Sequence, residues 1–210
     1  MSTVANDLFA LVMKDLDDEN AIRSTTPDLF LRHVNRAQQW VALRYQLLRE
    51  VFAFPLYQHV PIYALVTVHP RLVVITHMTH VSDGTPLARV AMTSLRYKDT
   101  AWFVTEGSSA FFYRLGWRYI GVYPVPSNNA TATVTGLLLP ATVTSMISRL
   151  QIPDSYVPHV SLVTAGLLMV ARERRYGEGI ARIRQGLGIA QAPQSPAPSA
   201  GTQEAASVAN

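Results

Sequence analysis

The segment Val160–Ala171 is apolar on almost every side, and this constrains the fold more than any other feature of the sequence. It follows Ile152-Pro153-Asp154, and Pro158 is tolerated only in a first helical turn, so we expect a helix that begins near residue 154 or 155. A helix that is apolar all round must be covered on every side. We expect other helices of the chain, together with a neighbouring subunit, to cover it. The segment is far shorter than the roughly 18–20 residues that cross a bilayer, so no membrane span is expected.

Two helices are expected in the first part of the chain. The first runs from about Thr3 to Leu16, where apolar side chains recur at helical spacing. The second begins at Thr25-Thr26-Pro27-Asp28, which supplies a capping hydroxyl, a proline for the first turn and an acid near the positive helix end. This helix is expected to extend from Pro27 to Glu50, because one face carries a continuous apolar stripe of Phe30, Val34, Ala37, Val41, Tyr45 and Leu48.

Between Pro55 and Pro140 the pattern changes to short alternating runs rich in Val, Thr and Tyr, which is typical of β-strands. Ser82-Asp83-Gly84 predicts a turn, and Leu115-Gly116 predicts a hairpin between two aromatic-rich strands. Together the runs predict a β-sandwich or a small barrel. The expected strands are Val60–Val68, Leu72–Thr79, Ala88–Ser94, Ala101–Thr105, Ala110–Leu115, Trp117–Tyr123 and Thr131–Leu138.

We expect Gly177 and Gly179 to end the apolar helix. A short last helix is expected after them, ending at Gly186 to Gly188. The pattern predicts an α+β fold: an α-helical bundle from N- and C-terminal helices with an inserted antiparallel β-sandwich/barrel domain and a flexible C-terminal tail. The expected units are 1–54 (N-terminal helices of the bundle), 55–150 (inserted β domain), 151–190 (C-terminal helices that complete the bundle) and 191–210. This last segment, rich in Ala, Pro, Ser and Gln, is expected to be flexible or ordered by a partner.

The sequence shows no constellation of catalytic or metal-binding residues. The chain has no Cys, which excludes a disulfide scaffold, a thiol nucleophile and an iron–sulfur cluster. Its acidic beginning lacks the pattern of a secretory signal peptide. The pair His77-x-x-His80 near Asp83 is the one metal-like cluster, and we interpret it as a strand end, because strand residues three apart point to opposite faces. We therefore expect no enzyme activity, no catalytic residue, no metal and no cofactor.

Charge is segregated along the chain. Residues 1–22 carry five acids and one Lys, whereas residues 23–190 carry 17 cations and eight acids. Sixteen of the 18 cations are Arg, a side chain suited to bidentate pairing at interfaces and with phosphates. The basic segment after the apolar helix is either a solvated helix end or a contact to a partner protein or DNA. The candidate contact residues are Arg172, Arg174, Arg175, Tyr176, Arg182 and Arg184.

A second set of residues mixes aromatic and basic side chains within the β region. Such a mixture occurs on stacking surfaces for single-stranded nucleic acid. Alternate aromatic residues also form the cores of β-sandwiches, and we favour this interpretation. The set consists of Trp102, Phe103, Phe111, Phe112, Tyr113, Arg114, Trp117, Arg118 and Tyr119.

Four short motifs follow one another along the chain. They are Thr26–Gln38 in the second helix, the β run Trp117–Pro126, the strand Thr131–Pro140 that ends in Leu-Pro, and Ile152–Tyr156 before the apolar helix. In their order and spacing they resemble the head–tail adaptor family of tailed bacteriophages, also called connector or head-completion proteins, over about residues 1–190. The chain departs from that family's pattern in lacking a Trp ahead of the second helix, in Pro158 and in the Pro/Ala-rich tail.

The resemblance implies a structural virion protein of the head–tail junction, assembled in the host cytoplasm, and not an enzyme. It implies that copies form a ring, usually of twelve, beneath the portal protein and around the passage for DNA. One face of the ring would bind the portal and the other a downstream tail or nozzle protein, with Arg172–Arg184 and the tail 191–210 docking on the portal. The alternative is a nucleic-acid-binding accessory protein that uses the aromatic and Arg surface.

Overall fold

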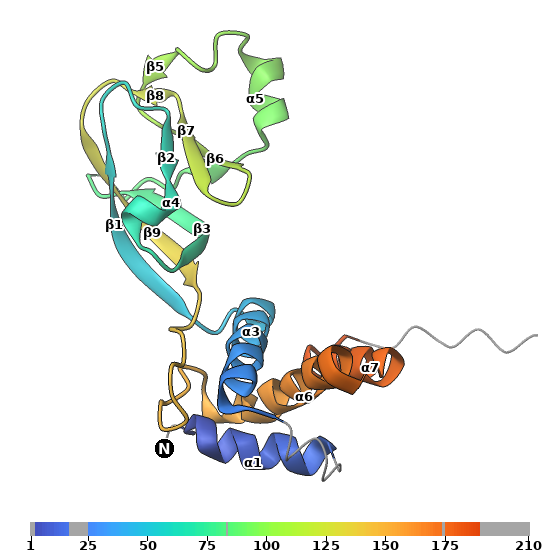
Figure 1. Ribbon diagram of the computed structural model, residues 1–210. Helices are drawn as coiled ribbons and strands as arrows, with labels where there is room; N and C mark the ends of the chain where they lie inside the picture. The colour runs from blue at the N-terminus through green and yellow to red at the C-terminus, as the bar shows by residue number, and fades with distance from the viewer. Residues whose placement is uncertain (1–2, 17–24, 83, 174, 190–210) are drawn as a thin grey trace, which may run out of the picture.

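The apolar segment lies in the helix α6 (Val157–Leu168), at the centre of a base made of helices. The computed structural model describes residues 3–16, 25–82, 84–173 and 175–189. Figure 1 shows the helical base at one end of an elongated molecule and the β-strands at the other. The base consists of α1 (Ala5–Leu16), α3 (Pro27–Tyr45), the short 3-10 turn η1 (Asp154–Tyr156), α6, the π-helical turn η2 (Met169–Glu173) and α7 (Tyr176–Gly186).

Three helices of the same chain cover α6. It contacts α1, α3 and α7, and its residues Val160, Val163 and Ala165 have no exposed area. Its start also agrees with the sequence, because Pro158 lies in the first turn, where a missing N–H costs no hydrogen bond. A neighbouring subunit is therefore not needed to cover this helix, contrary to our expectation.

The helix α3 begins as predicted and ends earlier. The hydroxyl of Thr26 accepts a hydrogen bond from the N–H of Leu29, which caps the first turn. At the other end Gln46 adopts a left-handed backbone conformation with φ 53° and ψ 44°, which stops the helix at Tyr45. The expected extension to Glu50 is wrong, because Leu48 continues the apolar spacing only by coincidence and Arg49 already begins a strand.

The β part contains two main sheets whose inner faces share one core. One sheet has the order β1-β9-β3 and the other β2-β7-β6-β4, with a further pair β5-β8. The core joins side chains of both, such as Phe54 and Val134 from the first sheet and Phe112 and Val122 from the second. The strands are β1 (Arg49–Leu56), β2 (Ile62–Ala64), β3 (Leu72–His80), β4 (Ala88–Arg89), β5 (Glu106–Gly107), β6 (Phe111–Leu115), β7 (Tyr119–Tyr123), β8 (Val125–Pro126) and β9 (Ala130–Leu138). The α+β fold class is confirmed.

Several expected strands are shorter than predicted or are replaced by helix. The expected strand Val60–Val68 is strand only at β2 and then turns into α4 (Leu65–Val68). Ala88–Ser94 pairs only over β4 and continues into α5 (Met92–Lys98), and Ala101–Thr105 forms turns. Leu65 of α4 joins the core between the sheets, and Trp102 packs on Tyr113 of β6. Apolar residues of these two segments cover a sheet instead of extending it, a role that local alternation does not distinguish. The predicted hairpin at Leu115-Gly116 is confirmed, with β6 antiparallel to β7 and Gly116 at φ +60°.

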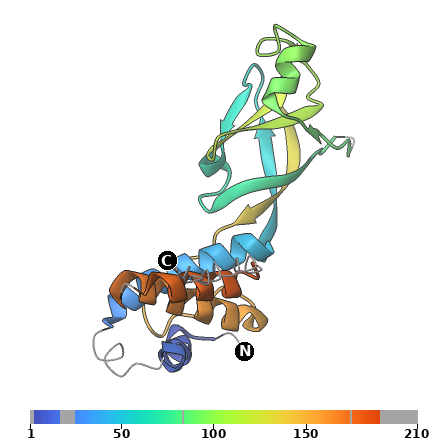
Figure 2. The same ribbon diagram turned by 90° about the vertical axis from the view of Figure 1, so that its right-hand side faces the viewer.

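Two chain segments join the base to the β part. The strands β1 and β9 lead out of and back into the helices, as Figures 1 and 2 show. The returning chain packs on the base, since Val143 and Leu150 belong to the helical core and Asn35 exchanges hydrogen bonds with the backbone of Val143. The units 1–54, 55–150 and 151–190 stay a prediction. In the part of the chain described, no helix is long and apolar enough to cross a membrane.

Candidate functional site

The predicted basic segment lies on η2 and α7, beside the central helix. Arg175, Tyr176, Arg182 and Arg184 are described, whereas Arg174 and the side chain of Arg172 lie outside the described residues. Arg175 pairs with Glu178 three residues later. Tyr176 is 56% exposed, Arg184 is exposed and Arg182 is half-buried. The structure therefore presents Tyr176, Arg175 and Arg184 to the surrounding solvent, on the helix that ends the described chain.

Glycines set the position of α7 against α6. A Cβ at Gly179 would lie 2.7 Å from the carbonyl oxygen of Gly166, and a Cβ at Gly186 would lie 2.8 Å from that of His159. Because both neighbours are backbone atoms, the two antiparallel helices approach too closely for any larger residue at these positions. The expectation that Gly177 and Gly179 end the apolar helix is wrong. Both lie inside α7, where Gly179 allows close packing.

The end of α7 is held by α3 and α6. The Nε of Arg44 donates to the carbonyl oxygen of Leu187 at 3.1 Å, and the Nδ1 of His159 donates to that of Gly186 at 2.8 Å. The ring of Tyr45 packs against His159 with 5.1 Å between ring centroids. Carbonyl groups at a helix end lack partners within the helix, so these donors satisfy them and fix where the chain leaves the base.

The aromatic and basic set of the β region does not form one surface. Phe112 and Tyr113 are buried, and Trp102 packs edge-on against Tyr113. Phe112 belongs to the core between the two sheets, whereas the adjacent Tyr113 points to the other face of the strand pair. The interpretation that alternate aromatics form the core therefore holds for Phe112 and not for the whole set. Trp117 and Tyr119 remain 78% and 50% exposed at the end of the β6–β7 hairpin. The buried members make a continuous stacking surface over the whole set impossible.

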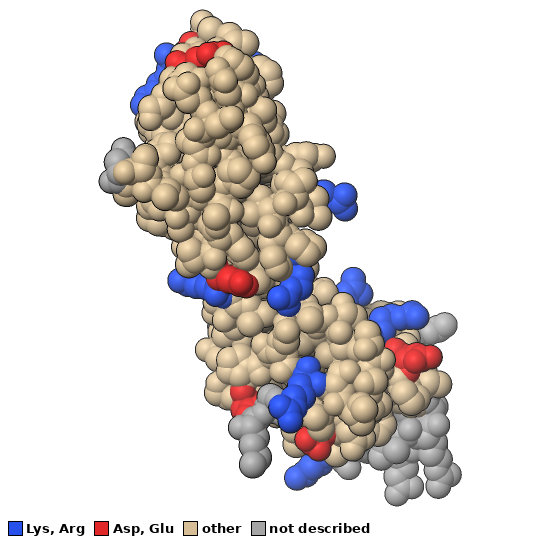
Figure 3. All heavy atoms as spheres, turned by 90° about the vertical axis from the view of Figure 1, so that its left-hand side faces the viewer, with Lys and Arg blue, Asp and Glu red and all other residues tan. Residues whose placement is uncertain are grey.

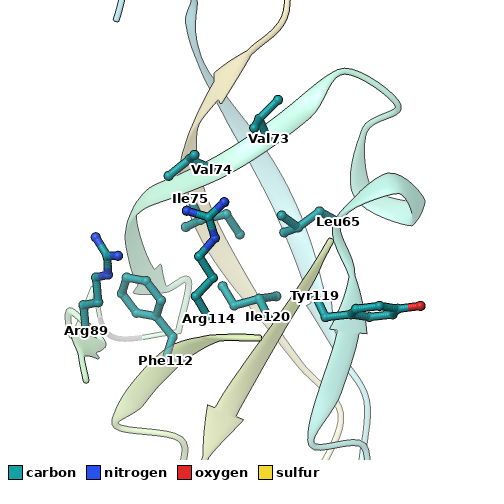
Figure 4. Close-up of a pocket in the computed structure, with 9 residues that line it drawn as sticks. All are labelled: Leu65, Val73, Val74, Ile75, Arg89, Phe112, Arg114, Tyr119 and Ile120. Atoms are coloured by element: carbon teal, nitrogen blue, oxygen red, sulfur yellow. The ribbon is translucent and has the colours of Figure 1, made fainter. Parts of the chain in front are cut away.

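One small cleft at the lower end of the β part contains an arginine on the inner side of the sheet. Arg114 follows Phe112 by two residues and pairs with Ile120, so all three side chains point between the two sheets. Figure 4 shows Arg114 and Arg89 on either side of Phe112, with both guanidinium groups directed towards β3. The cleft is lined by Leu65, Val73, Val74, Ile75, Arg89, Phe112, Arg114, Tyr119 and Ile120.

In the sequence, Arg114 belongs to the set of aromatic and basic residues, and no local pattern distinguishes Arg89. The signal was present in the alternation, because Arg114 occupies a position at which Phe112, Ile120 and Val122 predict an apolar residue. An arginine at such a position is unusual unless it is paired.

The metal-like histidines are separated. His77 is exposed on β3, whereas the Nε2 of His80 lies 2.6 Å from the carbonyl oxygen of Ser109; Asp83 lies outside the described residues. Within the described ranges, no group of three or more His, Asp or Glu side chains is arranged to hold a metal ion.

The side of the molecule on which β1 lies carries little charge over the β part. In Figure 3 the blue and red side chains gather at the top and at the waist, and the area between them is almost uncharged. After the charged residues Arg49 and Glu50 at its start, β1 exposes Val51, Ala53 and Pro55. The neighbouring β9 exposes Ala130 and Thr131, and its Thr133 and Thr135 are half-buried. A face of this kind is buried at lower cost than a charged one.

The chain was also compared with known protein families and with curated proteins. A protein-family model described as SU10 adaptor protein matches residues 4–199, which includes the helical base, the β part and the first residues of the tail. A search of curated proteins finds no match to the chain.

Proposed function

The chain belongs to the SU10 adaptor protein family, and from this premise we propose that it forms a ring beneath the portal that connects the capsid to the tail. A phage adaptor protein is a structural component of the virion and associates with other head and tail proteins. The proposed ring surrounds the passage for DNA, and twelve is the expected copy number. This function requires contacts to the portal, to a downstream tail or nozzle protein and to the neighbouring copies.

The observation that carries the proposal is the closely packed α6–α7 pair. The glycine contacts and the hydrogen bonds from Arg44 and His159 fix a basic helix at the surface of the base. A rigid, charged helix beside the point at which residues 190–210 begin is suited to docking on a large partner. We propose that Arg172, Arg174, Arg175, Tyr176, Arg182 and Arg184 contact the portal or the DNA, and that the tail docks with them.

The elongated shape of the molecule supports the proposal that its two ends bind different partners. The helical base and the β part have separate cores and lie at opposite ends of the molecule. We propose that the base faces the portal and that the β part faces the downstream tail or nozzle protein. The uncharged face over β1 and β9 then packs against a neighbouring copy, where burying it removes no charge from water.

The proposal is tested by negative-stain imaging of the protein mixed with the portal protein of the same phage. The expected result is a ring stacked under the portal. The variant Arg182→Glu/Arg184→Glu and a chain that stops at residue 190 are each expected to weaken portal binding in a pull-down. Arg96→Glu is the matched control, because Arg96 is an exposed arginine on α5 in the β part.

Monomers beside the portal, or unchanged binding by both variants, would contradict the proposal. The alternative of a nucleic-acid-binding accessory protein predicts a different result. In that case the protein binds free DNA with an affinity that falls steeply with salt, and the portal is not needed.

A further inference from the structure

Arg114 is a half-buried cation with one buried terminal nitrogen that the described residues do not pair. Its Nε donates to the carbonyl oxygen of Gly116 at 2.8 Å, and its guanidinium carbon lies 4.8 Å from the ring centroid of Trp117. One terminal nitrogen is buried and has no hydrogen-bond partner among the described residues. A buried, charged donor without an acceptor is costly, and a ligand that supplies an acceptor removes that cost.

Arg114 lines two spaces, a small inner cleft and a larger open groove. The inner cleft has a volume of about 10 Å³, which is room for one oxygen-sized atom. Arg89 and Arg114 also line an open groove of about 510 Å³ together with Val90, Ala91, Met92 and Thr93. Among the described residues, neither space is lined by an acidic side chain. The two arginines therefore match an anionic group that places one oxygen in the cleft while the rest of the ligand lies in the groove.

The backbone next to Arg114 also lacks a neighbour. β4 pairs with β6 only at Phe111 and Phe112, and the carbonyl oxygen of Phe112 accepts from the N–H of Val90. Two residues further on, the N–H and C=O of Arg114 face the same edge, beyond the end of β4. β3, which forms the opposite wall, is itself the last strand of its sheet. Free edges of this kind accept an extended segment of another chain.

Two aromatic residues follow Arg114 in the hairpin: Trp117, whose ring lies against its guanidinium group, and Tyr119, which lines one end of the cleft. Trp117 and Tyr119 from the hairpin and Val66 from α4 are between 50% and 78% exposed. The hairpin and α4 are joined by a hydrogen bond from the N–H of Leu65 to the carbonyl oxygen of Arg118. Tryptophan, tyrosine and arginine together are the residues that contribute most to protein–protein binding.

We propose that this cleft binds a protein partner through an extended segment with an Asp or Glu carboxylate that pairs with Arg114 and Arg89. The apolar neighbours of that carboxylate lie on Trp117, whose ring is already in contact with the guanidinium group of Arg114. A carboxylate of an extended segment fits better than a phosphate of nucleic acid. The cleft admits a single oxygen atom, which must reach the buried terminal nitrogen of Arg114 between apolar walls. A nucleic-acid backbone carries closely spaced phosphate charges, and two arginines would leave most of them unpaired. The proposal is independent of the ring and of the portal contact.

The test uses two blocked pentapeptides, Ac-Thr-Val-Glu-Val-Thr-NH2 and the same peptide with Gln in place of Glu. Binding to the full-length protein is followed by the NMR signal of the Trp117 indole N–H. We expect the Glu peptide to bind about ten-fold more tightly than the Gln peptide, because only the carboxylate pairs with the guanidinium groups. Arg114→Met is expected to reduce this ratio to about one.

The control is Arg118→Met, which removes an exposed cation from the same hairpin and is expected to keep the ratio. Arg114→Lys is the second variant; it keeps the charge but loses the bond to Gly116, and it is expected to lower the ratio as well. Equal binding of both peptides by the wild type, or an unchanged ratio in both Arg114 variants, would overturn the proposal. Tighter Arg114-dependent binding of a ten-residue oligothymidylate would overturn it in favour of nucleic acid.

Discussion

Tyr113 occupies the space that a side chain at Gly121 would need. The two residues face each other across the β6–β7 pair, and a Cβ on Gly121 would lie 2.1 Å from the Cζ atom of the tyrosine ring. The ring has no exposed area and is covered by Trp102, at 5.4 Å between centroids. The glycine therefore lets an aromatic residue lie flat across the strand pair, and the segment that carries Trp102 closes over it.

Gly121→Ala is expected to destabilise the β part by about 2–3 kcal/mol. The new methyl group overlaps a buried ring that cannot move without displacing Trp102, and overpacking of this kind is costly. Urea denaturation followed by tryptophan fluorescence measures the effect. In the double variant Gly121→Ala/Tyr113→Ala the overlap is gone, so the alanine at residue 121 should cost little relative to Tyr113→Ala alone. Equal costs in the two backgrounds would show that Tyr113 is not the cause.

Tyr113→Phe is expected to leave the stability at neutral pH unchanged or to raise it by up to about 1 kcal/mol. The hydroxyl is buried and has no partner among the described residues, so its removal relieves an unpaired polar group. Burial also raises the pKa of Tyr113 to about 12, above the usual value near 10. The folded protein therefore keeps this proton more firmly than the unfolded chain, and stability falls as pH rises from about 10 to 12. The variant should show a smaller fall in urea denaturation at alkaline pH.

Sequence patterns predicted the parts of this fold in which burial is regular. The stripe of α3 and the alternation Thr131-Ala132-Thr133-Val134 each bury one face, and α6 is apolar all round and buried on every side, so residue spacing alone reveals all three. Sequence patterns failed for β1, because its first residues continue the helical spacing of α3. Only pairing with β9, some 80 residues later, makes that segment a strand.

The basic segment could be predicted from the sequence, whereas the cleft at Arg114 could not. The density of Arg after the apolar helix identifies the basic segment, although spacing does not reveal that Gly179 brings α7 against α6. The cleft at Arg114 depends on which strand lacks a neighbour, and that is decided by long-range pairing of β3 and β4. A local pattern marks Arg114 as unusual but does not show whether its charge is paired.

Asp99→Asn is expected to remove an acid-dependent loosening of the segment that carries α5. The carboxylate accepts hydrogen bonds from the hydroxyl of Thr105 at 2.5 Å, the N–H of Ala101 at 2.8 Å and the hydroxyl of Tyr123 at 3.0 Å. The bond from Thr105 is the largest cause that lowers the pKa of Asp99 below its usual value, and those from Ala101 and Tyr123 add to it.

Because the pKa of Asp99 is lower in the folded state, the stabilisation is complete above the unfolded value near 4. It is lost as pH falls from there through the folded value. The protection factors of the amides of residues 92–107, which are corrected for the intrinsic pH dependence of exchange, should therefore fall below about pH 4 in the wild type. In Asp99→Asn the same residues should exchange faster at neutral pH and change less with acid. Identical pH profiles in the two proteins would contradict this role.

Gly179→Ala is expected to separate α7 from α6 and to cost about 2–3 kcal/mol. The added methyl group would lie 2.6 Å from a side-chain carbon of Val170 and 2.7 Å from the carbonyl oxygen of Gly166. The backbone oxygen cannot yield without moving a helix that is buried on every side, so α7 must move instead. Amide hydrogen exchange should show faster exchange at Ile183 and Leu187, while the β part keeps its protection.

Gly177→Ala is the matched control on the same helix. No atom lies within 4 Å of a Cβ at Gly177, and its backbone is helical, so alanine should stabilise α7 by roughly 0.5 kcal/mol through its higher helix propensity. If the two glycine-to-alanine substitutions change the free energy of unfolding in opposite directions, the effect of helix packing is separated from that of helix propensity. If both variants stabilised the protein, α7 would not be held against α6 by the Gly166–Gly179 contact, and the rigid basic helix on which the portal contact rests would lose its main support.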